Sequence, residues 1–78
     1  MNRRTIRGRA RTYEQRRSQL ISMIDRLHDI VDAEIETLNF THDEREQNRL
    51  INSIERHQHE IERLEGLLEY NRIHNSIM

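Results

Sequence analysis

The chain has 78 residues, of which 33% are apolar and 35% are charged, with two glycines, one phenylalanine and neither proline nor cysteine. A chain of this length forms at most one small domain. The scarcity of turn residues and aromatic residues argues against a β-sandwich or β-barrel. The lack of cysteine excludes disulfides and thiolate metal sites. No apolar stretch reaches the roughly 18–20 residues of a membrane span, so we expect a cytoplasmic protein that makes no membrane contact.

The charge is divided unevenly along the chain. Residues 1–17 carry seven arginines against one acid, whereas residues 18–78 carry six arginines against thirteen acids, and no lysine is present. Guanidinium groups bind phosphates and carboxylates through two parallel hydrogen bonds, which an ammonium group cannot do. The candidate nucleic-acid-binding residues are therefore Arg3, Arg4, Arg7, Arg9, Arg11, Arg16 and Arg17.

Residues 1–11 contain five of these arginines and no acid. Such a segment cannot bury enough apolar surface to fold alone, so we expect a flexible, disordered basic arm. Three roles fit this arm: contact with nucleic acid phosphates, docking onto an acidic protein surface, and a solubilising tail. We favour the first role, since clustered arginines attract polyanions.

A first helix is predicted over residues 12–38. Its start is indicated by a capping box, Thr12-Tyr13-Glu14-Gln15, and its apolar face by a period of three to four residues. That face comprises Leu20, Ile24, Leu27, Val31, Ile35 and Leu38. Asn39-Phe40-Thr41 is the predicted turn, with Asn39 suited to a left-handed helix end.

A second helix is predicted over residues 42–73. Thr41-His42-Asp43-Glu44 matches a capping box at its start. Its apolar face follows a coiled-coil alternation through Leu50, Ile54, His57, Ile61, Leu64 and Leu68. Polar residues then occupy the continuation of this face, so the C-terminal end is expected to fray.

The two apolar faces can pair as an antiparallel hairpin. Leu20 with Ile61, Ile24 with His57, Leu27 with Ile54 and Val31 with Leu50 have residue numbers that sum to 81. The same register places Arg17 over Leu64 and Tyr13 beside Leu68. The sequence therefore predicts an all-α, two-helix coiled-coil hairpin.

A lone hairpin buries little apolar surface for its size, which favours self-association. Met23 and Ile30 flank the first apolar face, and Leu67 lies on the matching side of the second helix. These three residues are the predicted dimer interface of a homodimeric four-helix bundle. Ile21 and Ile51 lie on the opposite flank.

Candidate chemistry is sparse. His57 lies within the apolar face, either as a register-setting or pH-sensitive group or, as we favour, as a histidine satisfied by a carboxylate such as Glu60. Glu55, His59 and Glu62 share a helix face, as do Asp25 and His28, but neither set supplies the three or four convergent ligands that a firm transition-metal site needs. We expect no catalytic residue, no metal and no cofactor, and a non-enzymatic protein.

Two families offer partial resemblances. Glu14-Gln15-Arg16-Arg17 after an arginine-rich stretch resembles the basic region of basic helix-loop-helix transcription factors, which implies base recognition by a helix forking from a four-helix bundle. The predicted turn is shorter than the loop of that family, and the predicted register places Tyr13 and Arg17 inside the hairpin. The arm is also similar in composition to the arginine-rich RNA-binding segments of phage antiterminators.

The sequence as a whole predicts a small regulatory protein that binds DNA or RNA. Its arm contacts phosphates and its helical bundle sets the number of arms per assembly. The alternative is a protein–protein adaptor or inhibitor, of the kind encoded by phages or mobile elements, that binds a partner through the acidic surface of the hairpin.

Overall fold

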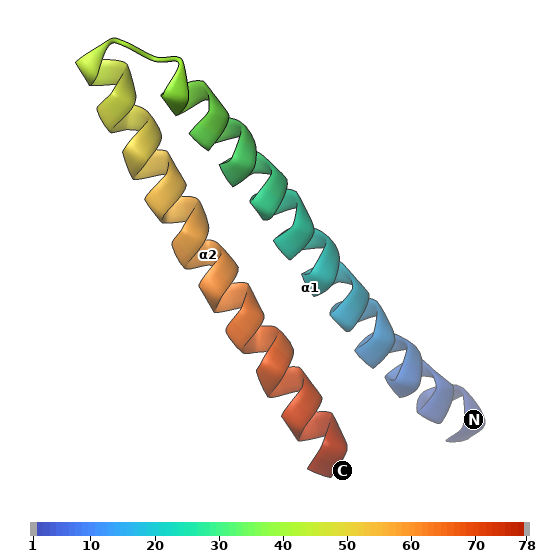
Figure 1. Cartoon of the computed structure of the whole chain (residues 1–78). Helices are drawn as coiled ribbons and strands as arrows, with labels where there is room; N and C mark the ends of the chain where they lie inside the picture. Colours follow the sequence, from blue (N-terminus) through green and yellow to red (C-terminus); the bar gives the residue numbers. More distant parts are fainter. Residues whose placement is uncertain (1, 78) are drawn as a thin grey trace.

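The computed structural model describes the backbone of residues 2–77 and the side chains of residues 13–74. It contains two helices, α1 (Asn2–Asn39) and α2 (Glu44–Ile77), which run antiparallel and pack against each other (Figure 1). The chain forms a narrow rod with principal extents of 61 × 19 × 13 Å. The predicted all-α helical hairpin is confirmed.

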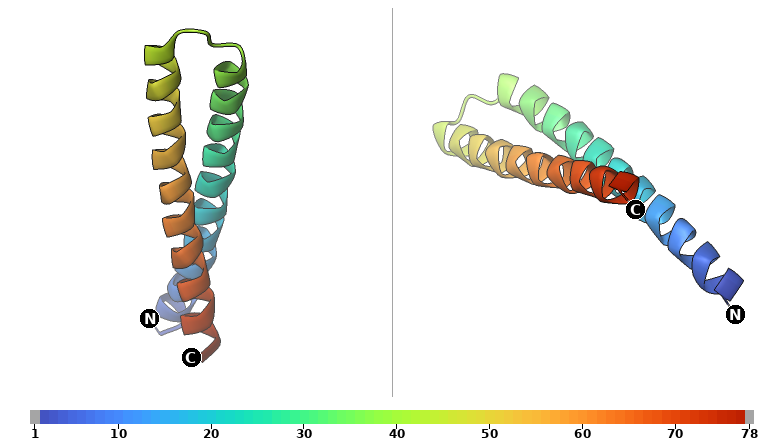
Figure 2. Two further views of the ribbon diagram at one scale, coloured as in Figure 1. Left: turned by 60° about the vertical axis from the view of Figure 1, so that its left-hand side comes forward. Right: turned by 90° about the horizontal axis from the view of Figure 1, so that it is seen from below.

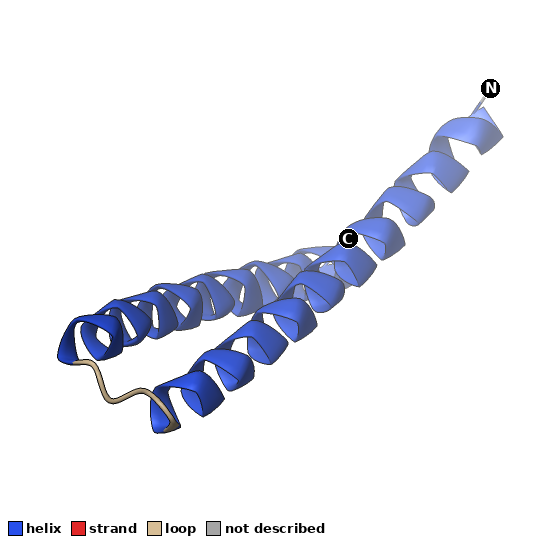
Figure 3. Cartoon of the chain, turned by 90° about the horizontal axis from the view of Figure 1, so that it is seen from above, coloured by secondary structure: helices blue, strands red, loops and turns tan. Residues whose placement is uncertain are grey.

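Helix α1 begins ten residues earlier than predicted. The backbone is helical from Asn2, so the expected helix start at Thr12 and the expected disorder of residues 1–11 are not confirmed. Five arginines with high intrinsic helix propensity and the absence of proline allow the helix to continue from the packed region, and the single Gly8 lowers the propensity without ending the helix. The right-hand view of Figure 2 and the view in Figure 3 show this part of α1 running past the C-terminal end of α2.

The structure assigns Thr41, which lies between the helices, to a different helix end from the one predicted. The Thr41 hydroxyl donates to the Thr37 carbonyl oxygen at 2.6 Å, so Thr41 caps the C-terminal end of α1 and does not start α2. Its own carbonyl oxygen accepts a hydrogen bond from the Gln47 side chain at 2.8 Å. Among the described residues none has a left-handed backbone, so the expected left-handed end at Asn39 is wrong. The Thr41 side chain satisfies a helix-terminal carbonyl that a left-handed residue would otherwise help to satisfy.

Apolar side chains from both helices fill a single seam. Its buried members are Leu20, Ile24, Val31, Ile54, Ile61 and Leu64, and Leu27, Leu38 and Leu68 pack against them. Leu64 is the most deeply buried, with 1% of its surface exposed. Ile35, expected in the seam, is 41% exposed, and the neighbouring Glu34 occupies the seam position in its place.

The helices pair seven residues away from the predicted register. Glu34 contacts both Ser53 and His57, and Thr41 contacts Gln47, so facing residues have numbers that sum to about 88. In the predicted register His57 would lie ten residues from the position facing Glu34, an axial separation of about 15 Å. The observed Oε1–Nδ1 distance of 2.8 Å excludes this.

A seven-residue slip returns every apolar position to the seam, so the heptad pattern alone does not distinguish the two registers. Polar groups do. The predicted register would set the imidazole of His57 against Ile24, whereas the observed register gives it the carboxylate of Glu34. A partly buried polar group without a partner costs free energy, and this favours the register that pairs both groups.

The slip also determines where the helices end relative to each other. In the observed register Ile77 lies opposite Arg11, so the α1 backbone over residues 2–10 has no α2 beside it. In the predicted register α2 would lie alongside α1 as far as residue 4. Neither helix, over the part of the chain that the structure describes, is long and apolar enough to cross a membrane.

Candidate interaction surfaces

A polar cluster interrupts the apolar seam near the turn. Glu34 lies on α1 with 16% of its side chain exposed, and Ser53 and His57 lie one turn apart on α2. One carboxylate oxygen of Glu34 accepts a hydrogen bond from the Ser53 hydroxyl. The other lies 2.8 Å from His57 Nδ1. Both oxygens of a partly buried carboxylate are thus satisfied by the opposite helix.

The charge of Glu34 is stabilised by these partners. Burial raises the pKa of its carboxyl, but hydrogen bonds from Ser53 and His57 and the charges of His57 and Arg56 outweigh burial and lower that pKa below its ordinary value. The carboxylate is therefore the form that the cluster favours.

The prediction that a carboxylate satisfies His57 is correct in kind but wrong in partner. Glu60 instead binds Arg63 on its own helix through two hydrogen bonds, and the His57 partner comes from α1. Glu34 was missed because Ile35 beside it is apolar and also fits a helical period. The stricter seven-residue spacing from Leu20, Leu27 and Glu34 to Thr41 is the signal that identifies it.

The observed register divides the exposed surface into two long faces. The Glu34–Ser53 contact joins the flanks of the helices on one side, and a groove lined by Arg16, Leu20, Leu67, Tyr70 and Asn71 lies on that side. A second groove, lined by His28, Val31, Gln58, Ile61 and Glu62, lies on the other side. Each other exposed residue is assigned to the side that carries a groove residue one or more heptads away from it, since residues seven apart lie on the same side of a coiled-coil helix.

We call the side that carries Arg16 and Leu67 the basic face. Its charged side chains are Arg16, Arg26, Arg49, Arg56 and Arg63, with Glu46 and Glu60 between them. Arg49 lies 3.8 Å from Glu46, and Arg63 pairs with Glu60. On α2 the arginines recur every seven residues, which places them in one straight row along the coiled coil.

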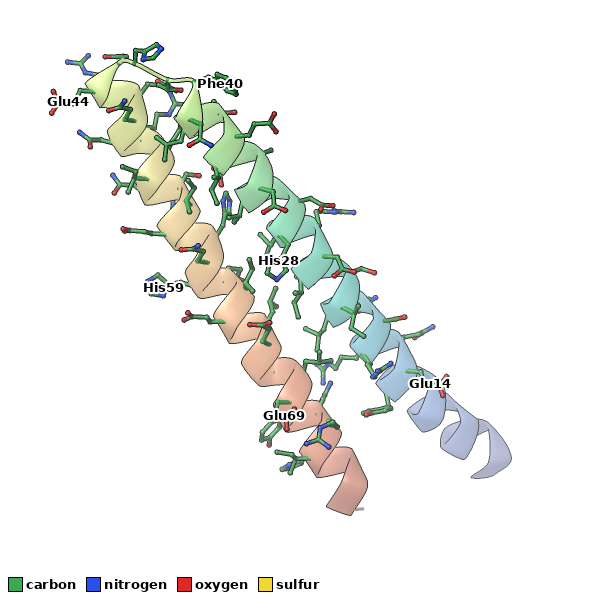
Figure 4. All side chains as sticks on the ribbon, viewed as in Figure 1. Glu14, His28, Phe40, Glu44, His59 and Glu69 are labelled. Carbon is green, nitrogen blue, oxygen red and sulfur yellow. The ribbon has the colours of Figure 1, made fainter. Side chains whose placement is uncertain are left out.

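We call the opposite side the acidic face. Its charged side chains are Glu14, Asp25, Asp32, Glu44, Glu55, Glu62, Glu65 and Glu69, with Arg72. Arg72 binds Glu69 at 2.6 Å. Figure 4 labels four side chains of this face, Glu14, His28, Glu44 and Glu69, spread along nearly the whole paired region. The formal charges are +3 for the basic face and −7 for the acidic face.

The three predicted interface residues do share one side of the hairpin. Met23, Ile30 and Leu67 all lie on the basic face and are 47%, 36% and 42% exposed. The acidic face has a matching set, Ile21, Ile35 and Ile51, of which Ile35 and Ile51 are each 41% exposed. Each face thus combines three apolar side chains with charges of mainly one sign.

The predicted nucleic-acid-binding residues fall into two groups. Arg16 and Arg17 are exposed on α1, and Arg16 lines the groove next to Tyr70. Arg17 lies opposite Asn71, so the expected packing of its stem over Leu64 is wrong because of the register slip. Arg3, Arg4, Arg7, Arg9 and Arg11 lie on the helical backbone of α1, but their side chains are outside the described residues.

Tyr70 and His74 form an exposed stacked pair near the end of α2, with ring centroids 4.3 Å apart and the hydroxyl 3.1 Å from Nε2. Within the described part of the chain no group of three or more histidine, cysteine or acidic side chains is arranged to hold a metal ion. No family model, curated protein or solved structure matches the chain.

Proposed function

We propose that this protein is a non-enzymatic nucleic-acid-binding regulator whose N-terminal arginines contact phosphates. The single observation that carries the proposal is the register. It leaves the α1 backbone over residues 2–10 clear of α2, so a segment with a high density of arginine extends beyond the hairpin (Figure 2).

The arginine spacing supports binding along a polyanion. Positions 3, 7 and 11 recur every four residues, a spacing that keeps residues on one side of a continuous helix. Arg16 and Arg17 follow on the paired part of α1. Each phosphate neutralised on duplex DNA releases counterions and contributes about −0.9 to the slope of log affinity against log salt.

Self-association would present two or more arginine segments on one rigid body. Met23, Ile30 and Leu67 provide an exposed apolar strip for such contact, in a hairpin whose own seam is narrow. Two weak phosphate-binding segments on one body gain affinity through effective concentration.

A gel shift with a duplex DNA and a hairpin RNA of about 30 nucleotides tests the proposal. A chain that lacks residues 2–11 should lose binding to both probes at low salt. The matched control changes Arg49 and Arg56 to Gln and retains the N-terminal arginines. If the full chain binds neither probe at low salt, the proposal is wrong.

The acidic face favours a second candidate, an adaptor or inhibitor that binds a basic protein. Its charge of −7 is exposed along both helices, and an acidic rod can imitate nucleic acid toward a basic partner. Under this hypothesis capture of a basic partner survives replacement of the N-terminal arginines by Ala and is lost when Glu55 and Glu62 become Gln.

A further inference from the structure

We infer that copies of this chain associate by placing the basic face of one hairpin on the acidic face of the next. This inference depends on the self-association in the proposed function and not on nucleic acid binding. It replaces a symmetric contact, in which two copies of the same face meet, with a heterologous contact between different faces.

The charge pattern disfavours a symmetric contact. If two basic faces met, Arg26, Arg49, Arg56 and Arg63 of one copy would face the same row on the other, since all are exposed on that side. If two acidic faces met, eight acids would face eight acids. Like charges brought together across an interface repel each other and suppress that pairing. A basic face against an acidic face avoids both costs.

The apolar residues match this arrangement. Met23, Ile30 and Leu67 on the basic face form a strip next to the seam, and Ile21, Ile35 and Ile51 form the equivalent strip on the acidic face. At equal height along the rod, Met23 and Leu67 of one copy lie next to Ile21 of the other, and this is the apolar centre of the contact. Arginines and acids surround it, as in known interfaces.

Charged residues of the basic face also lie at the same heights along the rod as acids of the acidic face. In the observed register Arg56 is level with Asp32 and Glu55, and Arg63 is level with Asp25 and Glu62. Two hairpins stacked in the same orientation thus bring both arginines opposite acids without an axial shift. Pairing of Arg63 with Glu60 leaves the row with net positive charge.

A heterologous contact leaves one basic and one acidic face uncovered at the ends of any open assembly. The wild-type protein should therefore form a concentration-dependent series of species that shortens as salt rises. Sedimentation velocity at low and high salt measures this directly.

Two charge-reversal variants separate the possibilities. One replaces two arginines of the basic face by acids (Arg26→Glu with Arg63→Glu), and the other replaces two acids of the acidic face by arginines (Asp32→Arg with Glu55→Arg). All four positions are exposed, and circular dichroism checks that each variant keeps the wild-type helix content. Each variant alone should associate at least about tenfold more weakly than wild type.

The mixture gives the decisive result. The basic-face variant still has a normal acidic face, and the acidic-face variant still has a normal basic face. Mixed one to one, they should form a heterodimer that does not grow further. If the acidic-face variant alone associates like wild type, the heterologous contact is wrong but self-association stands. If wild-type protein stays monomeric, the self-association in the proposed function is wrong as well.

Discussion

Replacing Glu34 by Ala tests the polar cluster that sets the register. The substitution removes the carboxylate that accepts hydrogen bonds from Ser53 and His57 on the opposite helix. A hydrogen bond to a charged group contributes about 1.5–3 kcal/mol. Because 31% of the His57 side chain and 16% of the Glu34 side chain are exposed, competition with water reduces each of these two bonds to about 1 kcal/mol, below that range. The loss should total about 2 kcal/mol in the free energy of unfolding.

Urea denaturation followed by circular dichroism measures this loss at one fixed protein concentration, because self-association would change the apparent stability. In thermal unfolding the loss corresponds to about 10 °C in Tm for a domain of this size. The matched control is Glu36→Ala, which makes the same chemical change at an exposed position of α1. If the two variants lose the same stability, the cluster contributes nothing and the reasoning is refuted.

Three further predictions concern the pH dependence of the Glu34 cluster, the packing of the seam and a glycine within α2. The folded pKa of Glu34 is below its ordinary value of 4.5, so the stabilisation by its carboxylate is present above pH 4.5 and is lost as the pH falls through the folded pKa. The difference in the free energy of unfolding between wild type and Glu34→Gln should therefore narrow below pH 4.5. A difference that stays constant with pH would contradict the role given to the Glu34 carboxylate. Leu64→Ala should cost about 2–5 kcal/mol because that side chain is 1% exposed, whereas Leu67→Ala in the same urea titration should cost less than about 1 kcal/mol. Gly66→Ala should stabilise α2 by about 1 kcal/mol, since a Cβ there meets nothing within 4 Å; a lower Tm would indicate that residue 66 needs the freedom of glycine.

The hairpin could be predicted from periodicity because its seam residues recur at coiled-coil spacing on both helices. The side of the hairpin shared by Met23, Ile30 and Leu67 also followed from spacing. The register could not be predicted this way, since Leu27 fits equally well opposite Ile54 or Ile61. A seven-residue slip leaves the apolar pattern unchanged, so short-range polar contacts decide the register.

Neither the capping of the helices at their connection nor the division of charge between the two faces could be predicted from the sequence, and the reasons differ. Thr41 lies between two helices and can cap either one, and only the geometry shows its hydroxyl on the Thr37 carbonyl. The sequence shows that residues 18–78 are acidic overall, with thirteen acids against six arginines. How these charges divide between two faces depends on which flanks of the helices adjoin, and the Glu34–Ser53 contact determines that.

The register between the helices creates the Glu34 cluster and leaves residues 2–10 of α1 beyond the end of α2. Spin labels at Asp25 and Glu62, compared with labels at Asp25 and Glu55, measure the register in solution by pulsed electron paramagnetic resonance. All three positions are exposed, and Glu55 and Glu62 are one heptad apart on the same side of α2. In the observed register Asp25 is nearly level with Glu62 and about 12 Å along the axis from Glu55. The observed register predicts the shorter distance for the Asp25–Glu62 pair, and a shorter distance for the Asp25–Glu55 pair would contradict it.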